Sequence, residues 1–282
     1  MKTADVITTG AELRARVSAW RHEAARVGLV PTMGALHEGH LSLITEAAKR
    51  SDRVVVSIFV NPRQFGPSED LERYPRNLEH DRGKLAVQDA TDVIFVPERG
   101  EIYPDGFATE ITVGGPACGL ESDFRPHFFA GVATVVAKLL ITVAPDVAMF
   151  GEKDFQQLLV VRRLVGDLGL PVEIVAVPIA REPDGLAMSS RNAYLGPRER
   201  RIAGKLNRVL ADVAERVRSG ASVAAAKREG RDALLAAGFD SVDYVAIRNA
   251  HTLAPLQRAT ADMRILAAAT IGGTRLIDNL PV

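Results

Sequence analysis

Two histidines spaced three residues apart follow the first strand predicted along the chain. Residues 31–40 lead from that strand into a helix predicted over 41–50, and Gly34 allows a tight turn between them. His37 and His40 share one face of the helix start, where unpaired backbone N–H groups and the helix dipole favour an anion. The segment therefore predicts a phosphate site with two imidazole donors, although a capping turn with two surface histidines fits the same spacing.

A lysine and a carboxylate follow another predicted strand. Residues 151–154 come directly after a strand-like run over 146–150, and open α/β sheets bind ligands at the carboxyl ends of their strands. Lys153 offers a compact positive charge for phosphate, and Asp154 suits ribose hydroxyls or a metal ion. The turn predicts a second part of a nucleotide site, although a solvated turn explains this segment about as well when it is taken alone.

Two more segments carry polar side chains at positions suited to binding. Residues 188–191 place two serine hydroxyls and a guanidinium in a row, a combination that can surround a triphosphate. A polar linker is nevertheless the better interpretation of that segment alone. Asn61 and Gln64 follow a strand predicted over 53–60 and offer neutral donors and acceptors for a small polar substrate, as does Gln157 near a helix start. The conjunction of these segments predicts a functional site more strongly than any one of them.

The elements that position these segments alternate between strands and helices. Five β-branched runs indicate strands, at 27–30, 53–60, 91–96, 146–150 and 172–177. Helical patterns lie between them at 41–50, 71–88, 132–143 and 155–168, after an opening helix capped by Thr9. Strands that are apolar throughout suit a parallel sheet covered by helices on both sides. The alternation predicts an α/β fold with a doubly wound (Rossmann-like) parallel sheet.

The pattern changes after about residue 183. Stretches rich in alanine and arginine over 197–218 and 222–237 indicate two helices. Three strand-like runs follow at 242–248, 263–269 and 274–277. Because Pro183, Asp184 and Gly185 form a turn signal, we expect one domain over residues 1–183 and a second, smaller α+β domain over residues 184–282.

Composition narrows the class of protein. The 282 residues carry 35 basic and 35 acidic side chains, so the chain lacks the surplus of positive charge that is typical of proteins that bind nucleic acid. Hydrophobic residues make up 47% of the chain, a fraction typical of globular proteins. Cys118 is the single cysteine, and no Cys/His cluster has zinc-site spacing. The first ten residues lack a signal-peptide pattern, and charge and proline interrupt the apolar stretch 132–150. We expect a soluble cytoplasmic protein with neither a membrane nor a nucleic-acid partner.

Four motifs together resemble those of the pantothenate synthetase (pantoate–β-alanine ligase) family. The chain has neither G-x-x-x-x-G-K-[ST] nor a G-x-G-x-x-G after a strand, so a bound nucleotide would need another device. The motifs are P-T-M-G-A-L-H-E-G-H from residue 31, F-V-N-P-x-Q-F-G from 59, G-E-K-D-F-Q-Q-L from 151 and R-E-P-D-G-L-A-M-S-S-R-N from 181. The resemblance places the chain in the nucleotidyltransferase superfamily of class I aminoacyl-tRNA synthetases, with 37–40 as the HIGH motif and 188–191 as the KMSKS loop.

The resemblance implies an ATP-dependent ligase of pantothenate biosynthesis that works in two steps. The carboxylate of (R)-pantoate would attack the α-phosphorus of ATP to give pantoyl adenylate and pyrophosphate. β-Alanine would then attack the activated carbonyl to give pantothenate and AMP. Such a transfer depends on in-line positioning and charge neutralisation, and no motif sets a serine or cysteine beside a histidine base, so we expect no covalent enzyme intermediate. The resemblance also implies a homodimer, with Mg²⁺ held mainly by ATP phosphates and no dedicated metal site in the protein.

The resemblance assigns the nucleotide contacts residue by residue. His37, His40 and Lys153 would be the catalytic residues, with His40 at the position of the family's proton donor and Lys153 supporting the transition-state charge. Ser189 and Arg191 would close over the triphosphate, and the smaller domain would close over the active site. The residues expected to contact ATP are Met33, Gly34, His37, Gly39, His40, Gly151, Lys153, Asp154, Ala180 (through its backbone, at the adenine), Met188, Ser189, Ser190 and Arg191.

The same resemblance assigns the substrate contacts. Gln64 and Gln157 would bind pantoate, with Asn61 assisting, and Gln64 would also lie close to β-alanine. One stretch departs from the family pattern R-P-x-H-F-x-G-V, because Phe128 occupies the histidine position and His127 comes one residue earlier. We expect either a lost contact there or a loop shift that restores it. Arg125, in the same stretch, is a further candidate.

Two other functions fit part of the pattern. A related adenylyltransferase would transfer AMP onto a phosphate, but such an acceptor calls for more arginine and lysine than Gln64 and Gln157 provide. A nucleotide-binding module without catalysis, or an RNA-binding relative of the synthetases, would share the fold. A binding module without catalysis is disfavoured because the chain keeps Lys153, Ser189 and Arg191. RNA binding is disfavoured by the zero net charge.

Overall fold

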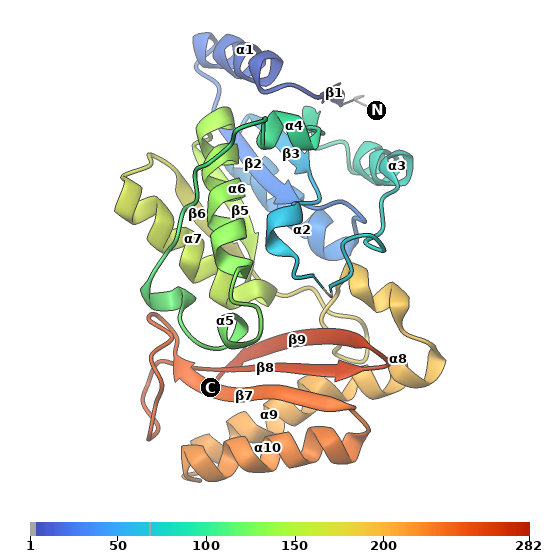
Figure 1. Ribbon diagram of the computed structural model, residues 1–282, viewed down its shortest axis with the longest axis vertical. Helices are drawn as coiled ribbons and strands as arrows, with labels where there is room; N and C mark the ends of the chain where they lie inside the picture. Colours follow the sequence, from blue (N-terminus) through green and yellow to red (C-terminus); the bar gives the residue numbers. More distant parts are fainter. Residues whose placement is uncertain (1–3, 68) are drawn as a thin grey trace.

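A parallel sheet forms the centre of the larger part of the molecule (Figure 1). The computed structural model describes residues 4–67 and 69–282. The strand order is β1-β4-β3-β2-β5-β6, and the paired strands run parallel. The strands are β1 (Asp5–Ile7), β2 (Val27–Thr32), β3 (Arg53–Ile58), β4 (Val93–Phe95), β5 (Val147–Gly151) and β6 (Glu173–Val177). This topology confirms the predicted doubly wound α/β fold.

Helices cover both faces of this sheet because its strands are apolar on both sides. Successive side chains of a strand point to opposite faces. Leu29 therefore packs in one core with α1, α6 and α7, whereas Val30 packs in another with α2 and α3. The helices are α1 (Gly10–His22), α2 (Glu38–Arg50), α3 (Leu78–Gln88), α4 (Arg99–Ile102), α5 (Glu121–Phe124), α6 (Phe128–Val143) and α7 (Phe155–Leu168).

The C-terminal part is an antiparallel sheet with two long helices packed on one face (Figure 1). Ile265 packs with residues of α9 and α10, whereas its neighbour Leu266 belongs to the core that contains α6 and α7. The sheet therefore lies between its own helices and the parallel-sheet part. The elements are α8 (Pro197–Ala203), α9 (Lys205–Arg218), α10 (Val223–Ala237), β7 (Ser241–Asn249), β8 (Met263–Ile271) and β9 (Thr274–Pro281).

The prediction of a single helix over 197–218 is wrong, because the chain forms two helices that meet at Gly204. A Cβ at Gly204 would lie 2.2 Å from Oδ2 of Asp184. That carboxylate accepts two hydrogen bonds from Arg200 of α8, at 2.5 and 3.0 Å. Glycine at the joint between α8 and α9 thus leaves room for the Asp184 carboxylate of the preceding loop.

Smaller differences concern where elements begin. The helix predicted over 71–88 begins only at Leu78, where Asn77 caps it by accepting a hydrogen bond from the His80 N–H at 3.0 Å. β1 has three residues, too few to give a pattern, and no strand was predicted there. Thr9 caps α1, as predicted.

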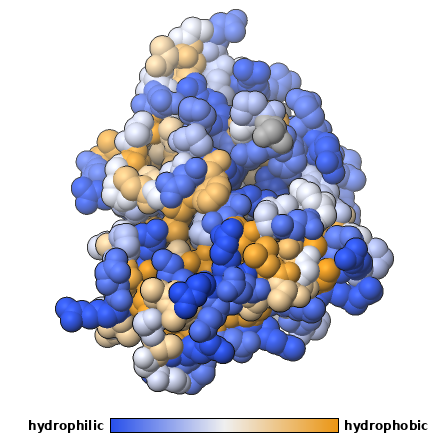
Figure 2. All heavy atoms as spheres, turned by 60° about the horizontal axis from the view of Figure 1, so that its bottom comes forward, coloured by the Kyte–Doolittle hydropathy of each residue, from blue (hydrophilic) through white to orange (hydrophobic). Residues whose placement is uncertain are grey.

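The exposed apolar side chains are distributed rather than gathered. The view in Figure 2 shows a face on which hydrophilic residues predominate and hydrophobic ones form smaller groups. Within the described part of the chain, no helix has the length and apolar character needed to cross a membrane. The exposed large hydrophobic residues lie on six different elements and are Val6, Val87, Phe124, Ile141, Leu168 and Leu235.

Candidate active site

A cavity of about 780 Å³ lies at the carboxyl ends of β2, β3 and β5. β2 pairs with β3 on one side and β5 on the other, so the strand order reverses at this point, where open α/β sheets bind ligands. The C-terminal sheet contributes another wall through residues such as Tyr244 and Arg275. The predicted site residues that line the cavity are Met33, His37, Gly39, His40, Asn61, Gln64, Gly151, Lys153, Asp154, Gln157, Ala180, Met188, Ser189, Ser190 and Arg191.

The two histidines cap the start of α2, and their rings lie against one another at a tilt of 43°. His37 is the N-cap residue, and its Nδ1 accepts a hydrogen bond from the Gly39 N–H at 3.1 Å. The Nδ1 of His40 accepts one from the His37 N–H at 3.3 Å, and the ring centroids are 4.1 Å apart. Because both Nδ1 atoms accept, each neutral ring carries its proton on Nε2. The two interpretations of this segment are therefore compatible: the Nδ1 atoms cap the helix, and the Nε2–H groups are the two donors.

The surroundings of both histidines favour the neutral imidazole. Burial, with the positive charges of Lys153 and Lys84, lowers the pKa of His37 to about 4, against a smaller opposing effect of Asp154. Burial is also the main reason that the pKa of His40 lies well below its usual range, followed by His37 and the same two lysines. At neutral pH the rings are hydrogen-bond donors without charge, and nearby cations supply the positive potential for an anion.

A buried carboxylate that sequence reasoning missed holds the loop before α2. Asp81 of α3 is 1% exposed and accepts hydrogen bonds from the N–H groups of Ala35 and Leu36, at 2.9 and 2.8 Å. Gly34 has φ +80°, which glycine adopts without strain. It does not line the cavity, and its backbone conformation instead turns the loop so that Asp81 can hold it.

The segment 188–191 folds back over the cavity and is tied to two other loops. Ser189 accepts a hydrogen bond from the Arg191 N–H, and the Ser190 hydroxyl donates to the Ala35 carbonyl at 3.1 Å. Arg191 donates through Nε and Nη2 to the two carboxylate oxygens of Asp70, at 3.0 and 2.8 Å. Partial burial would raise the pKa of Asp70, but the hydrogen bonds and charge of Arg191 lower it. One edge of the Arg191 guanidinium is thereby fixed, while Nη1 makes no bond to Asp70.

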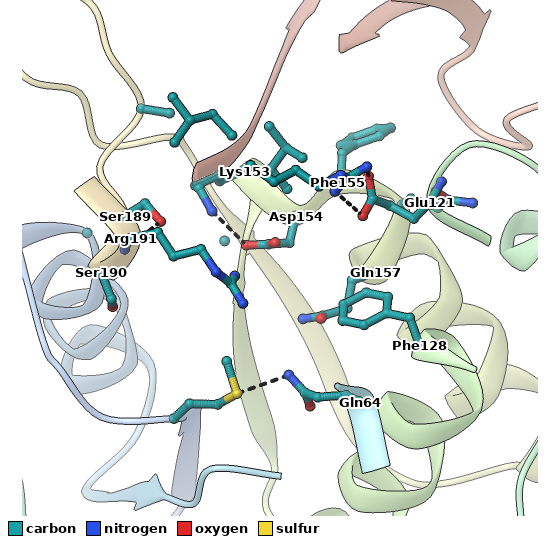
Figure 3. Close-up of a pocket in the computed structure, with 18 of the residues that line it drawn as sticks. Gln64, Glu121, Phe128, Lys153, Asp154, Phe155, Gln157, Ser189, Ser190 and Arg191 are labelled. Carbon is teal, nitrogen blue, oxygen red and sulfur yellow. Dashed lines mark hydrogen bonds and ion pairs between the residues drawn. The ribbon is translucent and has the colours of Figure 1, made fainter. Parts of the chain in front are cut away.

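The Gly151–Asp154 turn brings the side chains of Lys153 and Asp154 to the same cavity (Figure 3). Lys153 Nζ lies 3.6 Å from Oδ2 of Asp154, and the lysine side chain is 23% exposed. The Ala180 carbonyl accepts a hydrogen bond from the Met188 N–H at 2.9 Å, which joins the loop after β6 to segment 188–191. Positive charge from Lys153 and Arg191 and donor groups from the α2 cap thus face one space.

A neutral part of the cavity is formed by two glutamines, a methionine and an aromatic ring (Figure 3). The Nε2 of Gln64 donates to Sδ of Met33 at 3.0 Å. Asn61 is 1% exposed, and its Nδ2 donates to Gln64 Oε1 and to the Gly131 carbonyl, both at 3.1 Å. Its Oδ1 accepts from the Tyr103 hydroxyl at 2.7 Å. In this structure Asn61 therefore holds Gln64 in place, and the two glutamines present the amides that face the cavity.

The departure from the family pattern has a clear structural form. Phe128 lines the cavity, whereas His127 is exposed and lies outside the lining residues, so no loop shift brings it in. The guanidinium of Arg125 lies 3.9 Å from the centre of the Phe128 ring and pairs with Glu69 at 2.6 Å. Arg125 also donates to the Gln64 carbonyl at 3.1 Å. Its charge is thus compensated by protein carboxylates, and it supports the loop that carries Gln64.

A buried ion cluster joins α5 to the C-terminal sheet at the edge of the cavity. Glu121 accepts hydrogen bonds from Arg275 of β9 at 2.7 and 2.8 Å and from the Tyr244 hydroxyl of β7 at 2.6 Å. Arg275 also pairs with Asp243 at 2.7 Å. Sequence reasoning missed these residues because no local motif marks them.

The sequence and the fold of the chain are similar to those of known ligases. The model of the family "Pantoate-beta-alanine ligase" matches residues 5–281. The chain is 56% identical over 282 residues to pantothenate synthetase of Mesorhizobium japonicum, covering 100% of this chain and 99% of that protein. Among solved structures it resembles pantothenate synthetase from Thermus thermophilus, with a TM-score of 0.92, 50% identity and 98% of each chain covered. It also resembles pantoate-beta-alanine ligase from Francisella tularensis, complexed with beta-gamma ATP and beta-alanine, with a TM-score of 0.84, 34% identity and coverage of 99% and 97%.

Proposed function

The chain belongs to the pantoate–β-alanine ligase family, and we propose that its cavity joins pantoate to β-alanine with consumption of ATP. The products are pantothenate, AMP and pyrophosphate, formed through pantoyl adenylate. The observation that carries this proposal is the convergence of four separate motifs on one cavity at the reversal of strand order. Lys153, Arg191 and the α2 cap supply positive charge and donors to that cavity, and Gln64 and Gln157 supply neutral amides.

In the first step an oxygen of the pantoate carboxylate bonds to the α-phosphorus of ATP, and pyrophosphate leaves as its bond to that phosphorus breaks. Lys153 and Arg191 neutralise charge on the phosphates, and Ser189 and Ser190 add hydroxyl donors. His37 and His40 are neutral at pH 7 and donate through Nε2 to phosphate oxygens. Donors fixed before the reaction stabilise developing charge without reorganising during it.

The remaining ATP contacts follow the same arrangement. Met33, Gly39 and Met188 line the wall beside the phosphates, with Gly151, Asp154 and the Ala180 backbone toward the nucleoside. Gly34 contributes through the shape of its loop.

In the second step the amine of β-alanine bonds to the activated carbonyl carbon, the bond from that carbon to the phosphate oxygen breaks, and AMP leaves as the amine loses a proton. Gln64 and Gln157 bind pantoate through neutral hydrogen bonds, and Gln64 lies close to the incoming β-alanine. Asn61 assists by holding the Gln64 amide. Because the side chains assigned to pantoate are neutral amides, with Arg125 paired with Glu69 beside them, they suit hydroxyl and amide groups better than a phosphorylated acceptor.

Mg²⁺ is proposed to enter with ATP rather than to reside in the protein. In the described residues no group of three or more histidine, cysteine, aspartate or glutamate side chains could hold a metal ion. Asp154 is the partly exposed carboxylate nearest Lys153. Mg²⁺ keeps several waters and needs only one or two carboxylates beside substrate phosphates, so the residues present fit an ion held mainly by ATP and supplying charge neutralisation.

We also propose a division into a catalytic domain over residues 1–183 and a smaller domain over 184–282 that closes over the active site. The core between the antiparallel sheet and α9 and α10 supports this division, because all its buried residues lie within 184–282. We further propose a homodimer, on the strength of the family resemblance, and a cytoplasmic location, because a single cysteine fits a reducing compartment.

The test is release of pyrophosphate from Mg·ATP, measured with and without pantoate and β-alanine. We expect release that depends on pantoate, and AMP plus pantothenate once β-alanine is added. Release that depends instead on a phosphate monoester acceptor would assign the cavity to another adenylyltransferase. ATP binding without release in any mixture would indicate a binding module.

A further inference from the structure

The last strand of the chain reaches the turn that carries Lys153. Asn279 of β9 is 2% exposed, and its Nδ2 donates hydrogen bonds to the carbonyls of Glu152 and Lys153, both at 2.9 Å. Those carbonyls lie in the 3-10 turn Glu152–Asp154, which leads directly into α7. A side chain from the other sheet thus fixes the backbone of this turn.

The Asn279 amide is itself fixed from the opposite side. Its Oδ1 accepts a hydrogen bond from Nε of Arg264 at 2.6 Å. Arg264 also donates through Nη2 to the Glu152 carboxylate at 3.0 Å, and its guanidinium lies 3.8 Å from the centre of the Phe155 ring. With Oδ1 engaged by an arginine donor, the amide orientation is set and Nδ2 must face the two carbonyls. Glu152 is thus held at both its side chain and its backbone.

The neighbouring residue of β9 holds the other side of the nucleotide site. The Asp278 carboxylate accepts hydrogen bonds from Nη1 and Nη2 of Arg181 at 2.8 and 2.9 Å, and its side chain is 1% exposed. Arg181 follows Ala180 and precedes segment 188–191. Two consecutive residues of the C-terminal sheet therefore anchor the two loops that border the phosphate end of the cavity.

We propose that Asn279 is a positioning residue for Lys153. By holding the carbonyls on either side of the Lys153 amide N–H, it fixes the direction in which the lysine leaves the backbone. The C-terminal sheet thereby sets the geometry of adenylyl transfer without contacting substrate. The inference rests on the proposed function, because Lys153 matters only if phosphate charge develops beside it.

The test compares Asn279→Asp and Asn279→Ala with the wild-type enzyme in pantoate-dependent pyrophosphate release. Asp keeps the size and the acceptor for Arg264 but cannot donate to the carbonyls when ionised. We expect kcat to fall by about 10²-fold in both variants, the scale of a misplacement near 1 Å, with KM for ATP changed much less. Asn249→Ala is the matched control, since Asn249 lies in the same sheet and its side chain bonds only to residues of its own turn among those described. It should keep the wild-type kcat.

A second measurement separates positioning from a general structural role. Groups that act through one another show non-additive effects, so Asn279→Ala should lower the residual single-turnover rate of Lys153→Ala little further. Thermal unfolding checks that each variant is folded at the assay temperature, and the isosteric Asp variant replaces the Ala variant if the latter is not.

Three outcomes would overturn the assignment. They are an unchanged kcat in both variants, a loss confined to KM for ATP, and a full additional loss on the Lys153→Ala background. A wild-type enzyme that releases no pyrophosphate with pantoate would instead refute the proposed function, and the role of Asn279 with it.

Discussion

Gly131→Ala is a single methyl addition that should separate the helix behind the cavity from the segment that carries Gln64. Gly131 is buried in α6 (Phe128–Val143), and an added Cβ would lie 2.2 Å from the Arg63 carbonyl oxygen and 2.8 Å from the Gln64 nitrogen. The oxygen distance must grow to at least 3.0 Å, because real Cβ contacts are essentially never closer. The Gly131 carbonyl also accepts the hydrogen bond from Asn61, so the shift disturbs the support of Gln64 as well.

Two opposing effects decide the change in stability. Replacing glycine by alanine inside a helix favours folding by about 1 kcal/mol. Overpacking a filled core costs about 1–3 kcal/mol, and the upper part of that range applies because the clash is with backbone rather than a flexible side chain. We therefore expect the free energy of unfolding to fall by about 1–2 kcal/mol. The displaced Gln64 should raise KM for pantoate at least several-fold, since a shift near 1 Å at a binding group can cost up to about 10²-fold.

Denaturant titration and steady-state kinetics on the same preparations test this expectation. Gly83→Ala is the matched control, because Gly83 lies within α3 (Leu78–Gln88) and, apart from its chain neighbours and the backbone of its own helix, no described heavy atom lies within 4 Å of its added Cβ. The control should gain up to about 1 kcal/mol and keep its kinetic constants. If Gly131→Ala also gains stability and leaves KM for pantoate unchanged, the close contact between α6 and the Gln64 segment does not position Gln64.

Four further predictions follow from the site. Lys153→Ala should lower turnover by orders of magnitude with the thermal unfolding midpoint little changed; near-normal adenylate formation in a single-turnover assay would contradict its role. Gln64→Ala should raise KM for pantoate and β-alanine, and an effect limited to ATP would place the pantoate pocket elsewhere. Glu121→Ala removes the acceptor of the Tyr244 hydroxyl and one of the two carboxylates of Arg275, and should lower the free energy of unfolding by about 1–3 kcal/mol in denaturant titration; a loss well below about 1 kcal/mol would argue against a buried cluster. The pKa of His37 is lowered from 6.5 to about 4, so the stability it contributes is complete above pH 6.5 and lost as pH falls toward 4; unfolding at pH 7 and pH 5 should show a smaller drop for His37→Asn than for the wild-type protein.

The sequence predicted the fold and the motif-bearing loops because those features are encoded locally. Continuous apolar strands require helices on both faces, and the spacing of His37 and His40 both caps a helix and places two imidazoles together. The ligand-binding position of the turn after β5 (Val147–Gly151) was likewise predicted from its place at the end of a parallel strand. For each segment taken alone, such as 188–191, the sequence did not distinguish a binding loop from a polar linker. The structure brings these segments to one cavity.

What the sequence could not provide depends on contacts between distant residues. Asp81 accepts a hydrogen bond from the Leu36 N–H, 45 residues away in the sequence. Asp70 and its partner Arg191 are 121 residues apart, and Asn279 and the Lys153 carbonyl are 126 residues apart. Buried hydrogen bonds of this kind depend on how the two sheets and their loops close on each other. An isolated aspartate or asparagine in the sequence gives no sign of its partner.

The central claim is that this cavity transfers AMP to the carboxylate of pantoate. The most direct measurement is to run the complete reaction with pantoate labelled with ¹⁸O in its carboxylate and to examine the AMP by mass spectrometry. Attack of that carboxylate on the α-phosphorus, followed by cleavage of the carbon–oxygen bond by β-alanine, predicts one ¹⁸O in each AMP formed. AMP without the label, produced together with pantothenate, would contradict the adenylate route and the roles assigned to the residues around it.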